Sequence, residues 1–272
     1  MITIASALYH EARPLIDWYD LKKNHEFQKV DVFENESLRV IITGTGKIQS
    51  AIAITHVLSQ SACGEKIINL GICGAVEEDI KTGSLFLVHE IRDFSSKKRY
   101  YPDILTDFQI PGIAVTTFDT PITQDQISQV SDKLEIVDME ASGFYESAIR
   151  YYSPDRIQVL KIVSDHLEGT RCTPDLVSDI FLQNKIQIQK IISHSPEKKE
   201  IINAEELLLL QQIAQTLKFT RTQWHMFLDF CKAYKIRTSN DFSILQKYLE
   251  MEVNNKTQNK GHFETIRSLL FA

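Results

Sequence analysis

Residues 135–145 change from strand-like to helix-like patterning within a few positions. Ile136 and Val137 form a short apolar run, and beyond Glu140 apolar side chains recur at the i, i+3, i+4, i+7 spacing of one helix face. The change of period falls at Asp138 and Glu140, so two carboxylates occupy the end of a strand. In α/β proteins ligands bind at the carboxyl ends of strands. This junction is therefore the first candidate for a functional site.

The spacing leaves two interpretations of these carboxylates open. A carboxylate at a strand end can accept hydrogen bonds from a pair of sugar hydroxyls. Alternatively, Asp138 or Glu140 only caps the helix and interacts favourably with its dipole. The spacing by itself favours the cap.

Residues 157–163 are almost continuously apolar, which is typical of a strand buried on both faces of a parallel sheet. Lys161 interrupts this run, and lysine is rarely buried without a partner. Either Lys161 forms an ion-paired polar site with nearby carboxylates, or the strand lies at the sheet edge and Lys161 faces water. The strand ends at Ser164 and Asp165.

Two strand-to-helix units precede this region. A strand over residues 2–7 leads into a helix over 10–19, and Glu11 lies just past the strand; a solvated first-turn glutamate is the simpler interpretation. A strand over 38–43 leads into the glycine loop 44–47 and a second helix, an arrangement that points N–H groups at a polar ligand. The loop lacks the dinucleotide fingerprint and the P-loop pattern, so a tight turn is favoured.

Further strands are predicted over residues 27–33, 66–70, 84–91 and 112–117. Gly71 and Gly74 follow the second of these and allow a ligand or another element to approach the backbone closely. Phe118 follows the last strand and either offers an aromatic face to a flat ring or belongs to the core. The basic residues 97–99 are expected to be a solvated surface.

The composition, with 43% hydrophobic and 24% charged residues among 272, is that of a globular protein large enough for one domain and an appendage. The net charge of −6 argues against nucleic acid and anionic membrane as partners. The N-terminus lacks the basic region of a signal peptide, and no apolar run approaches the ~20 residues that span a bilayer. The four cysteines show no metal-type spacing, so we expect a cytoplasmic protein with reduced thiols and without metal or cofactor.

The carboxyl-terminal quarter of the chain differs from the rest. A long amphipathic helix is predicted over residues 173–192, and a polar break follows over 193–200. Beyond it no strand is indicated, and four helices are expected, the first opened by a capping box at Asn203 and Glu206. We therefore expect a domain over residues 1–192 and a helical appendage over 196–272, whose simplest role is to stabilise the core.

These motifs together resemble the purine nucleoside phosphorylase and nucleosidase superfamily, and within it the methylthioadenosine/S-adenosylhomocysteine nucleosidases. The resemblance covers residues 1 to about 192 and implies an α/β fold with three αβα layers and a mixed central sheet. The family is usually oligomeric, often dimeric. The matching segments, in chain order, are Ala7-Leu-Tyr-His-Glu11, Gly44-Thr-Gly-Lys47, Asn69-Leu-Gly-Ile-Cys-Gly-Ala75, Val137-Asp-Met-Glu-Ala141 and Ser164-Asp165.

The resemblance also implies roles for individual residues. Glu11 would hold or activate the attacking water, and Met139 and Glu140 would line the ribose, with Glu140 taking its hydroxyls. Asp165, positioned by Ser164, would protonate the purine at N7. A general acid must hold its proton near neutral pH, which burial at a strand end favours. Carboxylates around the sugar would stabilise its developing positive charge.

Two departures from the family pattern bear on the reaction. Ile72 stands where phosphorylases carry a small hydroxyl residue that holds phosphate, and burying phosphate without cationic partners is costly. Lys161 stands where the nucleosidases carry arginine, which keeps the charge but loses the planar fork. The favoured reading is hydrolysis of an adenosine-type nucleoside, including 5′-modified ones. The alternatives are a phosphorylase that uses Arg13 or Lys161, and a nucleoside sensor whose helical appendage docks a partner.

Overall fold

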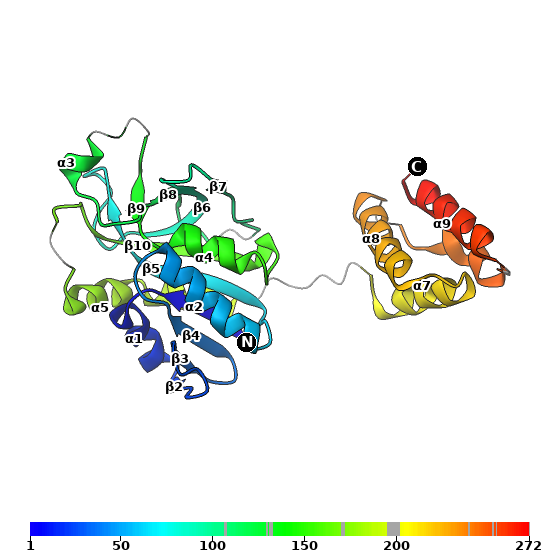
Figure 1. Cartoon of the computed structure of the whole chain (residues 1–272), viewed down its shortest axis with the longest axis horizontal. Coiled ribbons are helices and arrows are strands. Elements are labelled where there is room, and N and C mark those ends of the chain that lie inside the picture. Colours follow the sequence, from blue (N-terminus) through cyan, green and yellow to red (C-terminus); the bar gives the residue numbers. More distant parts are fainter. Residues whose placement is uncertain are drawn as a thin grey trace. The chain divides into compact units, whose positions relative to one another are not determined.

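The computed structural model describes residues 1–105, 108–128, 130, 133–169, 172–194, 202–238, 240–251, 253 and 255–271. The chain divides into two compact units, Met1–Pro196 and Glu197–Ala272 (Figure 1). Most of the polar break predicted over residues 193–200 lies outside the described residues. No helix in the described part of the chain is both long and apolar enough to cross a membrane.

The first unit is built on a mixed sheet of ten strands among the described residues, in the order β10-β6-β8-β9-β5-β1-β4-β3-β2, with β7 paired to β6. A further pairing joins β10 to β5, so that β5, β9, β8, β6 and β10 close into a ring. The strands are β1 (Ile2–Ser6), β2 (Lys22–Lys23), β3 (Asp31–Glu34), β4 (Leu38–Ile42), β5 (Lys66–Ala75), β6 (Leu85–Asp93), β7 (Arg99–Tyr100), β8 (Gly112–Thr117), β9 (Ile136–Asp138) and β10 (Ile157–Asp165).

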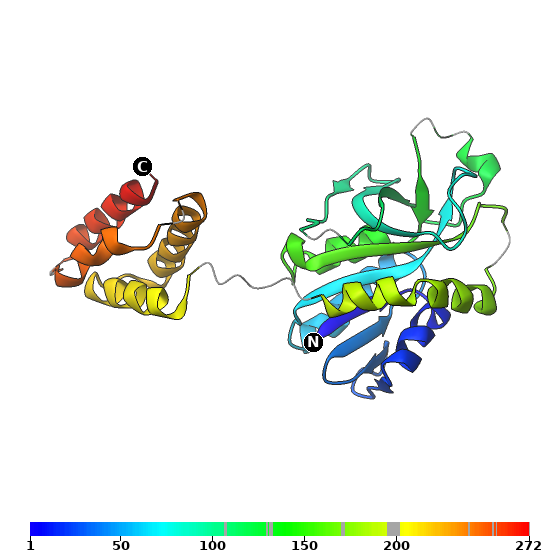
Figure 2. The same ribbon diagram turned by 180° about the vertical axis from the view of Figure 1, so that it is seen from behind.

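Helices cover both faces of this sheet. The helices of this unit are α1 (Tyr9–Trp18), α2 (Lys47–Gln60), α3 (Gln124–Ile127), α4 (Ala141–Ala148), α5 (Pro174–Gln183) and α6 (Lys185–Ser193), with the 3₁₀ turn η1 (Pro154–Arg156). Apolar residues of α2 and α4 share one core cluster with alternate residues of β1, β5 and β10. Those of α1, α5 and α6 share the second cluster with the intervening strand residues (Figures 1 and 2). The predicted α/β class and mixed sheet are thus confirmed.

Strand β10 lies between β5 and β6, parallel to the first and antiparallel to the second. This central position confirms the prediction from the apolar run at residues 157–163. It also excludes the edge-strand alternative for Lys161, whose side chain is 1% exposed.

Three predicted elements differ from the structure. Strand β5 continues to Ala75 through both glycines, because β10 pairs with it as far as Gly74 and β9 pairs with Gly74 and Ala75. The single helix predicted over residues 173–192 is two helices, interrupted at Asn184, whose Nδ2 donates to the carbonyl groups of Gly83 and Ile180 at 2.8 Å each. The strand predicted over 27–33 is confined to Asp31–Glu34, where β4 offers a partner.

The second unit consists of helices around their own apolar core. They are α7 (Ala204–Thr216), α8 (Arg221–Thr238), the 3₁₀ helix η2 (Ser243–Glu250) and α9 (Lys256–Phe271). The capping box predicted for the first helix is present, since the Asn203 side chain accepts from the Glu206 N–H and the Glu206 carboxylate accepts from the Asn203 N–H, at 2.9 Å each. The core includes the fully buried Phe227, Leu245 and Ile266. The third predicted helix, near residue 242, is a 3₁₀ helix.

Candidate active site

A cavity of about 680 Å³ lies at the carboxyl ends of β1, β5, β8, β9 and β10. Its size suits a small organic ligand. Of the residues predicted for the site, all but Lys161 line it. The predicted residues that do so are Glu11, Gly74, Phe118, Met139, Glu140, Ser164 and Asp165.

Glu11 lies in the first turn of α1 but is only 2% exposed, which excludes the solvated interpretation. Its Oε1 accepts the Ile72 N–H at 2.8 Å, and its Oε2 accepts the Leu8 N–H at 2.9 Å. These bonds fix the carboxylate at the cavity wall and leave each oxygen a lone pair for a ligand. Burial raises the pKa of Glu11, while the two backbone hydrogen bonds and the charge of Lys161 oppose the rise.

The Glu140 carboxylate is bound to the glycine loop. Its Oε1 accepts the Gly46 N–H at 2.7 Å, so the loop does present a backbone N–H to an anion, here a side chain of the protein itself. Burial, together with the neighbouring Asp138 carboxylate, raises the pKa of Glu140 to about 7. Glu140 therefore exchanges its proton near neutral pH.

Asp138 has the structural role that its spacing suggested. Its Oδ2 accepts the Ala141 N–H at 2.8 Å and caps α4, while its Oδ1 accepts the Thr117 hydroxyl at 2.7 Å. The Lys161 ammonium ion lies 2.7 Å from Oδ2, and both side chains of this ion pair are buried. Lys161 is absent from the described residues that line the cavity. Its charge therefore acts on the carboxylates of Asp138, Glu140 and Glu11 from outside the cavity.

Asp165 and Ser164, at the end of β10, also line the cavity. Ser164 Oγ lies 2.6 Å from Asp165 Oδ2 and 3.1 Å from the Cys73 carbonyl oxygen. Asp165 Oδ1 accepts the Leu167 N–H at 2.9 Å. One hydroxyl hydrogen cannot serve two acceptors fully, so Ser164 shares its hydrogen between the Asp165 carboxyl group and the Cys73 carbonyl oxygen. The bonds from Ser164 and from the Leu167 N–H hold the Asp165 carboxyl group in place at the cavity wall.

Gly71 and Gly74, which were predicted to allow close approach to the backbone, each have a side chain packed against them. Gly71 lies behind the Glu11 carboxylate, and a Cβ built there would stand 2.9 Å from Glu11 Oε1. At Gly74 a Cβ would collide with the Leu167 side chain. Close approach of the Glu11 and Leu167 side chains therefore explains why both positions are glycine. The sequence predicted a close approach at these positions but not which residues make it. The cavity residues that were not predicted include Leu8, Thr45, Pro121, Ile122 and Cys172.

The cavity is acidic. Glu11, Asp138, Glu140 and Asp165 line it, and none of its described lining residues is lysine, arginine or histidine. Arg13, which the phosphorylase alternative would use for phosphate, lies elsewhere: it is 61% exposed on α1, with its Nε 3.7 Å from Asp17. A free phosphate dianion would thus meet several carboxylates without a cation to offset their repulsion.

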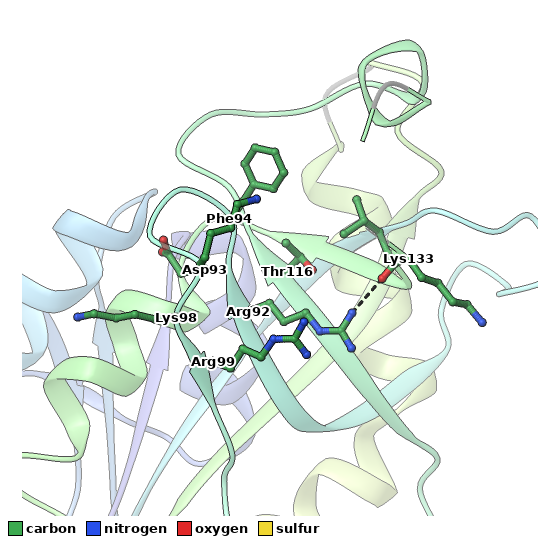
Figure 3. A pocket seen from close by; sticks show the side chains of 9 residues that line it. Arg92, Asp93, Phe94, Lys98, Arg99, Thr116 and Lys133 are labelled. Atoms are coloured by element: carbon green, nitrogen blue, oxygen red, sulfur yellow. Dashed lines mark hydrogen bonds between the residues drawn. The ribbon is translucent and has the colours of Figure 1, made fainter. Parts of the chain in front are cut away.

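A second cavity, of about 590 Å³, gathers the basic residues 97–99 with Arg92 and Lys133 (Figure 3). Glu90 binds both Arg92 and Arg99, at 2.6 and 2.7 Å, and Glu146 binds Lys98 at 2.9 Å. Lys98 and Arg99 are more than half exposed, as expected of a solvated surface. Because most of these cations have carboxylate partners, we do not assign a ligand to this cavity.

The mixed sheet and the cavity at its strand ends define a nucleoside phosphorylase-like α/β fold, and comparison with solved structures supports this class. No protein-family model matches the sequence, and no similar curated protein is found. Among solved structures, the methylthioadenosine/S-adenosylhomocysteine nucleosidase of Colwellia psychrerythraea in complex with adenine has a TM-score of 0.58 at 14% identity, over 70% of this chain and 93% of that chain.

Two further nucleosidases give similar values. The Arabidopsis thaliana 5′-methylthioadenosine nucleosidase has a TM-score of 0.59 at 16% identity, over 71% of this chain and 95% of that one. The Neisseria meningitidis methylthioadenosine/S-adenosylhomocysteine nucleosidase bound to methylthio-immucillin-A has a TM-score of 0.57 at 16% identity, over 70% and 97%. The first unit therefore has the fold of these nucleosidases.

Proposed function

We propose that the first unit hydrolyses the N-glycosidic bond of an adenosine-type nucleoside, including 5′-modified ones, and releases the free purine. The observation that carries this proposal is the convergence of Glu11, Glu140 and Asp165 on one cavity that has no described cationic lining residue. The unit has the fold of solved nucleosidases, which supports the same conclusion, and we propose that its layers have the αβα order.

In this reaction each carboxylate meets a different part of the substrate. Glu11, oriented by two backbone N–H groups, draws a proton from the attacking water; its raised pKa makes it a better base. Glu140 accepts the ribose hydroxyls beside Met139. Asp165, held by Ser164, protonates N7 of the purine and converts it into a good leaving group. The carboxylates also stabilise the positive charge that develops on the sugar.

Water rather than phosphate is the nucleophile in this proposal. A phosphorylase needs cationic groups beside the anion, but Arg13 is paired with Asp17 on the surface. The Ile72 side chain cannot hydrogen-bond, and its N–H already donates to Glu11. Lys47 and Lys161 are both bound to carboxylates of the protein. Their charges are already neutralised, which leaves them little attraction for a phosphate ion.

The test is release of free purine from adenosine, methylthioadenosine, S-adenosylhomocysteine, deoxyadenosine and inosine, with and without phosphate. Release without phosphate, with free sugar as co-product, is the expected result. Release of purine only when phosphate is present would establish the phosphorylase instead. Binding without any release would favour the sensor, with the second unit as the partner-docking element.

Two variants test the roles of individual residues. Glu11→Gln and Asp165→Asn should each lower kcat by roughly 10²–10⁴-fold, the usual contribution of one acid–base group. Asp79→Asn, an exposed aspartate outside the cavity, is the matched control and should turn over like the wild type. Normal turnover by either cavity variant would overturn the role given to that residue.

We further propose that the protein is a homodimer. Ile48 and Ile52 stand one turn apart on α2 and are 68% and 57% exposed. Exposed apolar groups of this size mark interaction surfaces when they gather. Light scattering should report a dimer, and the double substitution Ile48→Glu and Ile52→Glu should give a monomer. Leu208→Glu, which changes an exposed leucine of the second unit, should leave the dimer intact.

A further inference from the structure

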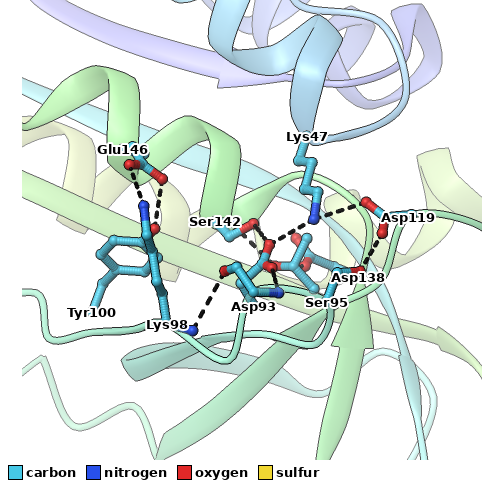
Figure 4. A network of polar contacts seen from close by, with 11 residues as sticks. Lys47, Asp93, Ser95, Lys98, Tyr100, Asp119, Asp138, Ser142 and Glu146 are labelled. Atoms are coloured by element: carbon cyan, nitrogen blue, oxygen red, sulfur yellow. Dashed lines mark hydrogen bonds and ion pairs between the residues drawn. The ribbon is translucent and has the colours of Figure 1, made fainter.

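Lys47 is the first residue of α2 and directly follows Gly46, whose N–H holds Glu140. Its side chain is absent from the described lining of the cavity and extends instead between two carboxylates (Figure 4). Nζ lies 2.9 Å from Asp93 Oδ2 and 2.7 Å from Asp119 Oδ1. These hydrogen bonds raise the pKa of Lys47, so the ammonium ion stays charged throughout the neutral range.

The Asp93 carboxylate connects Lys47 to two other elements. Asp93 ends β6 and is 5% exposed. Its Oδ2 also accepts the Ser142 hydroxyl at 2.8 Å, and its Oδ1 accepts the Ser96 N–H at 2.7 Å. Ser142 belongs to the first turn of α4, two residues after the cavity residue Glu140. The start of α2, the end of β6 and the start of α4 are thus joined at one buried carboxylate.

Asp119 connects Lys47 to the cavity wall. It follows Phe118, and residues 118 and 120–122 line the cavity. Asp119 is 52% exposed and also accepts the Ser95 hydroxyl, while Phe118 stacks on Phe94 with ring centroids 4.4 Å apart. Water screens this exposed ion pair more than the buried pair with Asp93. We call the ion pairs of Lys47 with Asp93 and with Asp119 its two arms. The Asp119 arm is therefore the weaker of the two.

The backbones of α2 and α4 are in close contact at the starts of the two helices. A Cβ at Gly143 would collide with the Lys47 carbonyl group, so the first turn of α4 lies directly against the start of α2. A shift of Lys47 would consequently displace Gly46 and α4 together. Both contribute to the placement of Glu140, one through its hydrogen bond and the other through its backbone.

We propose that Lys47 is a positioning residue for nucleoside hydrolysis, which clamps the Gly46 donor of Glu140 and the cavity wall at residues 118–122 in their reactive arrangement. This inference rests on the proposed function. The buried arm to Asp93 sets the geometry around Glu140, and the exposed arm to Asp119 holds the wall that the substrate contacts.

Steady-state kinetics of four variants test the clamp. Lys47→Met should lower kcat/KM roughly 10- to 100-fold, as expected when hydrogen bonds to a charged group are lost. Asp119→Asn should raise KM and leave kcat nearly unchanged, because it weakens only the arm to the wall. Lys47→Arg keeps the charge and should recover part of the activity. Lys98→Met is the matched control, because Lys98 is also bound to a carboxylate, that of Glu146, and lies outside the cavity.

Hydrogen–deuterium exchange separates failure of the clamp from failure of the proposed function. Without any substrate, Lys47→Met should speed exchange in peptides that cover residues 44–50 and 118–122, and Lys98→Met should not. The clamp is overturned if the wild type hydrolyses a nucleoside and Lys47→Met shows the same kinetic constants and the same exchange rates as the wild type. If the wild type releases no base, the function is overturned, and the exchange result alone decides whether Lys47 is a clamp. Equal losses of kcat/KM in Lys98→Met and Lys47→Met would also overturn the clamp.

Discussion

Replacing Lys161 with methionine should destabilise the first unit by about 3–5 kcal/mol, the usual cost of removing one partner from a buried ion pair. The Lys161 side chain is 1% exposed, and its Nζ lies 2.7 Å from a carboxylate oxygen of Asp138 whose side chain is 0% exposed. Methionine fills similar volume, so the loss comes from the uncompensated charge rather than from a cavity. Asp138 would keep only the Ala141 N–H and the Thr117 hydroxyl as donors.

Urea unfolding followed by tryptophan fluorescence provides the measurement. The chain has two tryptophans, Trp18 in α1 and Trp224 in α8, so a Trp224→Phe background makes the signal report the first unit alone. In that background the unfolding free energies of Lys161→Met, Asp138→Asn and the double variant form a cycle.

The double variant should lose less stability than the two single losses added together, because the second substitution removes the charge that the first leaves unpaired. Contacting residues show coupling of about 0.5–3 kcal/mol in such cycles. Strict additivity would refute the ion-pair argument. So would a loss below about 1 kcal/mol in Lys161→Met.

Further predictions concern Gly71 and Glu140. Gly71→Ala should lower kcat/KM, since its Cβ would stand 2.9 Å from Glu11 Oε1, whereas Gly261→Ala, with open space around it, should not; kinetics of both variants decide. The pKa of Glu140 is raised to about 7, and its ionised form accepts the ribose hydroxyls, so kcat/KM should fall as pH drops through about 7. The folded unit also binds this proton more tightly than the unfolded chain, so the free energy of unfolding should decrease as pH rises from about 4.5 to 7. Glu140→Gln should remove that pH dependence, which urea titrations of both proteins at pH values of about 4.5 and 7 measure. The same pH dependence in the variant and the wild type would show that Glu140 does not bind this proton.

The sequence by itself determined the elements whose signals are local. Hydrophobic periods of two and 3.6 residues, the glycine loop before α2 and the capping box at Asn203 each depend on neighbours within a few positions. The structure contains the glycine loop, the capping box and most of the elements that these periods predicted. The strand ends that carry Glu140 and Asp165 were predictable for the same reason. The resemblance of short motifs added their possible roles.

Only the tertiary structure decided which distant groups meet. The pairing of β10 with both β5 and β6 buries Lys161 and gives it Asp138 as partner. The same pairing extends β5 through its glycines, and Asn184 breaks a helix to bind the carbonyl of Gly83. Lys47 lies beside Asp93 and Asp119 for the same kind of reason. Sheet order and helix packing set these contacts between residues far apart in the chain, and no pattern of a few neighbouring residues encodes them.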